Sequence, residues 1–82
     1  MYRTTRYFDE EVLVDRDYLT VELCIHVIEN AVQREVQSDG RIRHWAFSEA
    51  LGGRALRVVT LNDGTTIHNA FLDRGFRREV ER

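Results

Sequence analysis

Two short loops of the form x-Asp-Gly constrain this chain most, because hydrophobic residues alternate with polar ones on both sides of each loop. The loops are Ser38-Asp39-Gly40 and Asn62-Asp63-Gly64. Such a loop suits a type I turn closed by a glycine in the left-handed region, which joins two antiparallel strands. The sequence therefore predicts two β-hairpins, with strands at residues 32–37, 41–47, 55–61 and 65–71.

The three-residue loop also predicts the register of the first hairpin. The expected pairs are Gln37 with Arg41, Val36 with Ile42, Glu35 with Arg43, Arg34 with His44, and Val32 with Ala46. One face then carries apolar residues, namely Val32, Val36, Ile42 and Ala46. The other face carries Glu35 and Arg43 as a cross-strand charge pair.

The same reasoning applied to the second hairpin places Val59 opposite Ile67 and Arg57 opposite Asn69. Its apolar face is then formed by Val59, Leu61, Ile67 and Phe71. A slip of one residue in either hairpin would exchange the two faces.

Two helices are expected before the hairpins. Residues 5–14 can form a helix with Thr5 as N-cap, with Phe8 and Val12 on one face, although residues 12–14 also suit a strand. A second helix is expected to begin after the N-cap Thr20. Its buried stripe follows the spacing i, i+3, i+4, i+7 and consists of Cys24, Val27, Ile28 and Ala31.

These elements predict an α+β fold in which two N-terminal helices precede an antiparallel sheet of about four strands. We expect residues 1–82 to form a single domain, because 82 residues allow one modest core. The strand order is left open, since residues 48–54 suit either a long hairpin loop or a crossover.

Cysteine content and hydropathy bear on the compartment. The chain has one cysteine, which excludes an internal disulfide framework, and charged residues interrupt its N-terminal segment as they would not in a signal peptide. No run approaches the roughly 20 apolar residues of a membrane span. We therefore expect a cytoplasmic protein without membrane contact.

Charge is distributed unevenly along the chain. Residues 1–40 hold four Arg against nine acidic residues, a net charge of −5, and residues 41–82 hold eight Arg against five, a net charge of +3. Every basic residue is Arg, whose planar guanidinium can donate two hydrogen bonds to one phosphate. The second half is thus compatible with a polyanionic partner.

The C-terminal segment adds aromatic residues to this positive charge. Phe71 and Phe76 alternate with Arg74, Arg77 and Arg78. Nucleobases stack on such rings while arginines hold phosphates, so RNA is a candidate partner. A salt-bridged surface tail is the structural alternative.

Histidines are the candidate acid and base groups. His44 and His68 lie on predicted strands in the basic half, and an imidazole titrating near neutral pH can serve in either role. The expected register places the two rings on opposite faces, so at most one acts. One Cys and three dispersed His lack the paired spacing of a zinc site, and no cofactor motif is present.

Three stretches carry a family resemblance: residues 39–45 (DGRIRHW), 56–64 (LRVVTLNDG) and 67–76 (IHNAFLDRGF). They resemble an uncharacterised bacterial toxin-like family, a domain of unknown function related to the BrnT and RelE ribonuclease toxins. The resemblance implies helices followed by an antiparallel sheet. It also implies cleavage of RNA, with a small antitoxin-like protein as inhibitory partner.

Two functions follow as hypotheses. The first is a metal-independent endoribonuclease with His44 and His68 as acid/base candidates and with three arginines stabilising the phosphate, namely Arg43, Arg57 and Arg74. The second is a non-catalytic module that binds a protein partner or associates with itself as a homodimer. The acidic first half and the basic second half suit such complementary association.

Overall fold

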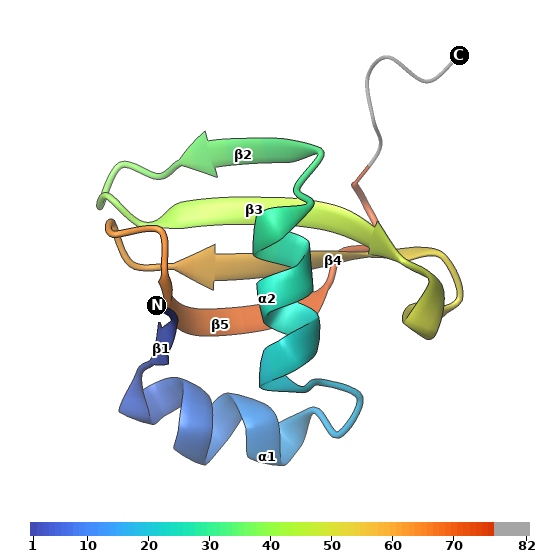
Figure 1. Cartoon of the computed structure of the whole chain (residues 1–82), viewed down its shortest axis with the longest axis horizontal. Helices are drawn as coiled ribbons and strands as arrows, with labels where there is room; N and C mark the ends of the chain where they lie inside the picture. Colours follow the sequence, from blue (N-terminus) through green and yellow to red (C-terminus); the bar gives the residue numbers. More distant parts are fainter. Residues whose placement is uncertain (77–82) are drawn as a thin grey trace.

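The computed structural model describes residues 1–76, which form an α+β structure with a five-stranded mixed sheet (Figure 1). Its elements are β1 (Arg3–Thr4), the π-helical turn η1 (Phe8–Val12), α1 (Leu13–Asp15), α2 (Val21–Glu29), β2 (Gln33–Val36), β3 (Ile42–Ser48), the 3-10 turn η2 (Glu49–Leu51), β4 (Arg54–Thr60) and β5 (Thr66–Leu72). The sheet order is β1-β5-β4-β3-β2. Arg77 and Arg78, which the sequence indicated as candidates for holding RNA phosphates, lie outside the described residues.

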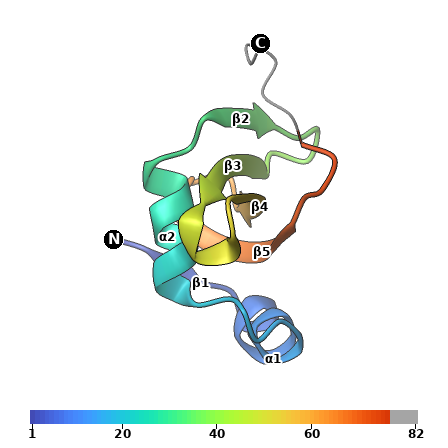
Figure 2. The same ribbon diagram turned by 90° about the vertical axis from the view of Figure 1, so that its right-hand side faces the viewer.

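The two faces of the sheet are covered differently. The helix α2 crosses one face, and η1 with α1 runs beside the edge formed by β1 and β5 (Figure 1). Within residues 1–76 no helix covers the opposite face, and only residues 73–76 pass over it (Figure 2). We call this second face the open face. Its side chains from β3 and β4 are Arg43, Trp45, Phe47, Ala55, Arg57 and Val59.

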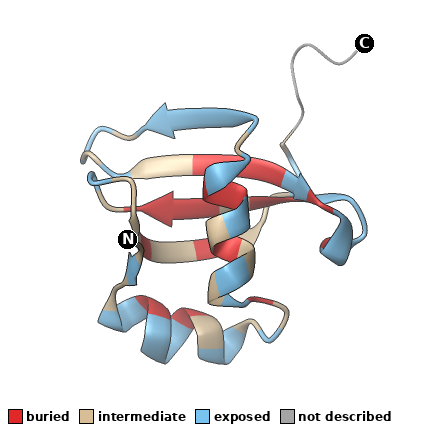
Figure 3. Ribbon diagram, in the orientation of Figure 1, coloured by how far each residue is buried: buried red, intermediate tan, exposed pale blue. Residues whose placement is uncertain are grey.

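The hydrophobic core lies between the sheet and the helices (Figure 3). The apolar helical residues fully buried there are Phe8, Val12, Cys24 and Val27, and the fully buried apolar sheet residues are Leu56, Val58, Ile67 and Ala70. Their spacing of three and four in the helices, and of two in β4, directs each set toward the same interior. The core therefore fixes which side chains of the sheet remain for the open face.

The first hairpin confirms the predicted register. Val36 pairs with Ile42, Glu35 with Arg43 and Arg34 with His44. The backbone N–H of Gln37 donates to the carbonyl oxygen of Arg41 at 2.7 Å, which closes the three-residue loop. Gly40 has a φ of 91°, the left-handed conformation that this turn requires.

The predicted register of the second hairpin is wrong. Val59 pairs with Asn69 and Thr60 pairs with Ile67, because a β-bulge interrupts the ladder between β4 and β5. The Asp63 carboxylate accepts from the backbone N–H groups of Thr65 and Thr66, so Leu61 closes the loop on Thr66, one residue later than expected. Consequently Ile67 is buried in the core, while Val59 remains on the open face.

The expectation of an antiparallel sheet of about four strands is incomplete. The fifth strand, β1, lies parallel to β5, with Arg3 opposite Thr66 and Thr4 opposite Ile67. The backbone N–H of Arg3 donates to Thr65 O at 3.1 Å, and that of Thr5 donates to Ile67 O at 3.0 Å. A strand of two residues is too short to show an alternating pattern in the sequence.

The helical predictions agree with the structure at both N-caps. Phe8 N donates to Thr5 Oγ1 at 3.1 Å, and Leu23 N donates to Thr20 Oγ1 at 3.0 Å. Residues 12–14 are helical rather than extended, and Ala31 follows the end of α2 instead of belonging to it. None of the helices within residues 1–76 is long and apolar enough to cross a membrane.

Residues 48–54, for which two connections were left open, form a hairpin connection. They contain η2 and the glycines Gly52 and Gly53, both with positive φ, and β3 and β4 pair as antiparallel neighbours. Strands β2 to β5 therefore follow one another across the sheet as a meander.

The turn at Gly64 offers a test of the second hairpin. Its φ is 75°, and the side-chain space is open except for Ile42 Cδ1 at 3.9 Å. We expect Gly64→Ala to lower the free energy of unfolding by about 1–2 kcal/mol, because an L-residue is strained in this conformation. Gly64→Asn should cost less, since asparagine tolerates the left-handed region. Urea unfolding measures both, and equal stability of Gly64→Ala and the wild type would contradict the turn assignment.

Candidate functional site

The carboxylate of Asp73 organises the open face. Its Oδ2 accepts hydrogen bonds from Trp45 Nε1 at 2.8 Å, from Arg57 Nη2 at 2.8 Å and from Arg57 Nε at 3.2 Å. Its Oδ1 accepts from the backbone N–H of Gly75 at 3.2 Å. One side chain therefore joins β3, β4 and the segment that follows β5.

Asp73 is ionised in this setting. Partial burial tends to raise the pKa of its carboxyl group, but the hydrogen bonds from Trp45 and Arg57 and the charge of Arg57 lower it, and the net pKa lies below the usual value. The side chains of Arg57 and Asp73 are 24% and 15% exposed. Their ion pair is consequently better shielded from water than an ordinary surface pair.

Aromatic rings surround this ion pair. Phe76 stacks on Trp45, with ring centroids 5.1 Å apart and an interplanar angle of 9°, and it contacts Phe47 at 5.8 Å. The Arg57 guanidinium lies 5.4 Å from the Trp45 ring and 4.8 Å from the Phe71 ring. These cation–π contacts help to fix the position of the guanidinium between the two rings.

A second charged pair lies beside the first. Arg43 Nη1 is 3.3 Å from Glu35 Oε1, and Arg43 Nε donates to Gln37 Oε1 at 3.1 Å. The Glu35 side chain is 51% exposed, so its carboxylate is accessible from solvent. This pair was predicted from the register of the first hairpin and is confirmed.

The two pairs border one hollow on the open face, with a volume of about 450 Å³. Its lining consists of Gln33, Glu35, Arg43, Trp45, Arg57, Asp73, Gly75 and Phe76. We call this the charged hollow. It combines cations, carboxylates and aromatic rings within one concave surface.

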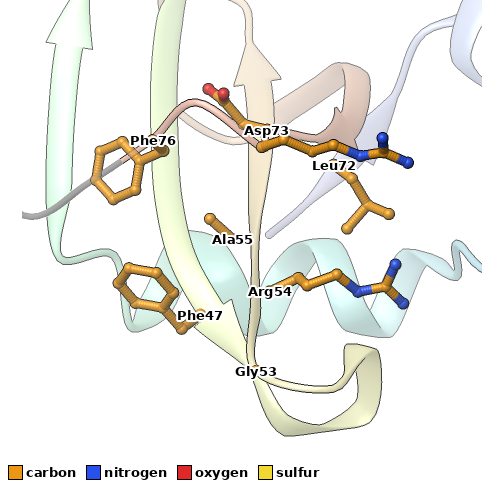
Figure 4. Close-up of a pocket in the computed structure, with 8 residues that line it drawn as sticks. Phe47, Gly53, Arg54, Ala55, Leu72, Asp73 and Phe76 are labelled. Atoms are coloured by element: carbon orange, nitrogen blue, oxygen red, sulfur yellow. The ribbon is translucent and has the colours of Figure 1, made fainter.

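A smaller pocket of about 260 Å³ adjoins the charged hollow and shares with it the segment that follows β5 (Figure 4). It is lined by Phe47, Gly53, Arg54, Ala55, Leu72, Asp73, Arg74 and Phe76. Asp73 and Phe76 therefore contribute to both cavities. We call this the aromatic pocket.

His44 lies on the face covered by α2 and is 2% exposed. Its Nδ1 accepts from Arg34 Nε at 3.2 Å, so the neutral ring carries its proton on Nε2, which lies 3.0 Å from Thr60 Oγ1. Arg34 Nη2 also donates to Ile28 O at 2.7 Å. Burial, together with the Arg34 charge, lowers the pKa of His44 to about 4.

His68 lies at the bulge in β5, close to the N-terminal segment. Its Nδ1 is 3.0 Å from Thr5 Oγ1, and its ring is 5.1 Å from the ring of Tyr7. Burial and the charge of Arg41 lower its pKa. His68 borders neither the charged hollow nor the aromatic pocket.

The structure thus brings only some of the sequence-predicted residues together. Arg43 and Arg57 share the charged hollow, and Arg74 lines the aromatic pocket, whereas His44 faces the core on the other side of the sheet. The sequence reasoning named Phe76 as a ring for base stacking, but it did not include Glu35 or Trp45 in a site. Alternation along β3 could have indicated Trp45, because it shares a face with Arg43.

The remaining groups to consider are possible metal ligands and the thiol of Cys24. No group of three or more His, Cys, Asp or Glu side chains within residues 1–76 is placed to hold a metal ion. Cys24 is buried, which raises the pKa of its thiol to about 12. It therefore remains a protonated core residue at neutral pH.

Comparison of the chain with protein-family models, with curated proteins and with solved structures gives no match.

The buried histidine predicts a pH dependence of stability. Because the folded pKa of His44 is about 4, the unfolded chain takes up a proton below pH 6.5 that the folded chain refuses. The free energy of unfolding should therefore fall between pH 7 and pH 5, by about 2 kcal/mol from this residue. In His44→Gln, which cannot titrate, this part of the fall should disappear. Urea unfolding at the two pH values measures it, and an unchanged pH dependence would contradict the buried neutral ring.

The Asp73 network should contribute to stability more than the exposed pair. We expect Asp73→Ala to lower the free energy of unfolding by about 1–3 kcal/mol, because Trp45 Nε1 and Arg57 lose their shared acceptor. Glu35→Ala, the matched control at a more exposed pair, should cost less than about 1 kcal/mol. Chemical unfolding of both variants compares them, and equal losses would show that Asp73 has no special role.

Proposed function

We propose that this chain is a metal-independent endoribonuclease of the toxin type that acts on single-stranded RNA at the charged hollow. The observation that supports it is the presence of two arginines, an accessible carboxylate and stacked aromatic rings around one concave surface. The resemblance, firmest over residues 39–76, to an uncharacterised toxin-like family related to the BrnT and RelE ribonuclease toxins points to the same substrate. In that setting the protein works in the cytoplasm and is inhibited by a small antitoxin-like partner.

The cleavage needs no group beyond those around the hollow and water. A base removes the proton from a 2′-hydroxyl, and the resulting oxygen attacks the adjacent phosphorus. The bond from phosphorus to the 5′-oxygen breaks, and that oxygen takes a proton from water. The hydroxide left behind takes up the proton that the base had removed, which restores the base. The products are a 2′,3′-cyclic phosphate and a 5′-hydroxyl, without any change of oxidation state.

Glu35 is the residue we assign to the base role. Its carboxylate is half exposed and borders the hollow next to Arg43. A carboxylate can take a hydroxyl proton when it is held within hydrogen-bond reach of it. His44 suits this role less well than the sequence suggested, because it is buried on the other face. His68 stays a prediction as an acid/base group, although it borders neither the charged hollow nor the aromatic pocket.

Arg43 and Arg57 are assigned to the phosphate. Negative charge increases on the non-bridging phosphate oxygens as the pentacoordinate transition state forms. Fixed cations at the hollow stabilise that charge. Arg57 is held against Trp45 and Phe71 and by Asp73, so its position is set before RNA binds. A nucleobase can stack against Phe76 at the rim of the hollow.

A specific observation favours a second candidate, a non-catalytic protein-binding module. Both arginines at the hollow are already paired with carboxylates, so the face carries little excess positive charge. Trp, Arg and Phe are also the residues that dominate protein interfaces. A partner protein or a second copy of the chain would then cover the open face.

Cleavage of a fluorescently labelled single-stranded RNA in the presence of EDTA tests the first candidate. We expect the wild type to cleave and Glu35→Gln to lose about 10²–10⁴-fold of the rate, as for removal of a general base. Arg43→Ala should lose about 10²–10³-fold. Arg57→Lys, which keeps the charge beside Asp73 but removes the planar fork, should also lose activity.

Arg6→Ala is the matched control, since Arg6 pairs with Glu10 on the N-terminal helical region, away from the hollow. Its rate should equal that of the wild type, and circular dichroism should show that all variants are folded. Full activity of Glu35→Gln would remove Glu35 from the mechanism. A wild type that cleaves no RNA but co-purifies with a small protein would support the second candidate instead.

A further inference from the structure

The aromatic pocket has chemistry of its own, apart from the charged hollow. Phe47 and Phe76 form one side of it, and Arg54 and Arg74 add two guanidinium groups to its lining. Figure 4 shows the rings of Phe47 and Phe76 together on one side of β4, with the Arg54 side chain extending on the other. The pocket therefore has an apolar, aromatic end and a cationic end.

Local hydrogen bonds hold these groups in place. Arg54 Nε donates to Leu51 O at 2.7 Å, which anchors the guanidinium at the end of η2. Phe76 is held by its stack on Trp45, and Asp73 N donates to Ala55 O at 3.0 Å, which fixes the segment above β4. Phe47 remains 42% exposed, so its ring is accessible to a ligand in the pocket.

The size of the pocket limits its ligand. Its volume of about 260 Å³ lies just below the roughly 300–1,000 Å³ of sites that enclose drug-sized molecules. A planar ring with one phosphate matches both the size and the two ends, because rings stack on phenylalanine and phosphates pair with arginine.

We propose that the aromatic pocket binds one nucleotide unit, with its base against Phe47 and Phe76 and its phosphate at Arg54 and Arg74. Where this nucleotide is part of an RNA strand, the inference rests on the proposed function. The strand would continue into the charged hollow past Phe76 and Asp73, which line both cavities. The pocket is then the subsite for a nucleotide next to the cleaved bond.

A free mononucleotide also carries one base and one phosphate, so the test compares a mononucleotide with an RNA strand. Adenosine 5′-monophosphate, adenosine, inorganic phosphate and a 2′-O-methylated RNA tetranucleotide, which cannot be cleaved, are titrated into the full chain. Binding is followed by NMR chemical shifts, including the indole N–H of Trp45, the single tryptophan. We expect the mononucleotide to bind at least about tenfold more tightly than adenosine or phosphate alone, since each of these fills one end only.

Two substitutions separate the two ends of the pocket. Phe47→Ala and Arg54→Ala should each weaken mononucleotide binding about fivefold or more, whereas Arg6→Ala, which also removes an exposed arginine, should leave it unchanged. Phe47→Tyr, which keeps a ring, should bind like the wild type and shows whether loss in Phe47→Ala comes from the ring. Unchanged binding in both Phe47→Ala and Arg54→Ala, or equal affinity for the mononucleotide and for phosphate, would overturn the proposal.

The comparison with the tetranucleotide identifies the source. Binding about tenfold or more tighter than that of the mononucleotide, and weakened by Phe47→Ala, supports an RNA subsite. Equal affinities support a site for a free nucleotide. If the mononucleotide binds here but RNA is not cleaved, the proposed function fails and the pocket stands. If RNA is cleaved and Phe47→Ala changes neither binding nor cleavage, only the pocket fails.

Discussion

The carboxylate of Asp73 is the interaction on which the open face depends. It receives hydrogen bonds from β3 through Trp45, from β4 through Arg57 and from the chain beyond β5 through Gly75. Together with the stack of Phe76 on Trp45 and the bond from Asp73 N to Ala55 O, it holds residues 73–76 over the sheet, where they form the wall that the two cavities share. Within residues 1–76 no helix covers this face, and Asp73, which follows the last strand, helps to hold residues 73–76 over it (Figure 2). The sheet surface is thereby divided into two adjoining concave surfaces, the charged hollow and the aromatic pocket.

The same carboxylate determines how much charge the face can offer to a ligand. The charge of Asp73 offsets that of Arg57, and the charge of Glu35 offsets that of Arg43. A phosphate of the proposed RNA substrate would therefore compete with an existing partner at each arginine. The two pairs differ in exposure, and a more exposed pair exchanges partners at lower cost than a shielded one. The Glu35–Arg43 pair is therefore the part of the hollow that can rearrange, while Arg57 and Asp73 serve as the fixed frame.

Much of the fold was predictable from local rules. Turn chemistry at Asp39-Gly40 and N-caps at Thr5 and Thr20 depend on neighbours within four residues, and each is found where expected. The bulge beside Ile67 and the strand β1 depend on contacts between distant segments, which alternation of side chains does not encode. The candidate site shows the same difference between features set by near neighbours and features set by distant segments. Arg43 was placed correctly by its hairpin register, whereas the burial of His44 required α2, Arg34 and Thr60 to be placed around it.

The parallel pairing of β1 with β5 has a consequence for how the chain is made. Arg3 pairs with Thr66, so β1 has no neighbouring strand until synthesis of the chain has passed Thr66. The meander of β2 to β5 joins only consecutive strands and can assemble progressively, as contacts of short sequence separation form early. Docking of β1 onto β5, which accompanies the burial of Phe8 and Val12, is therefore expected after the meander has formed.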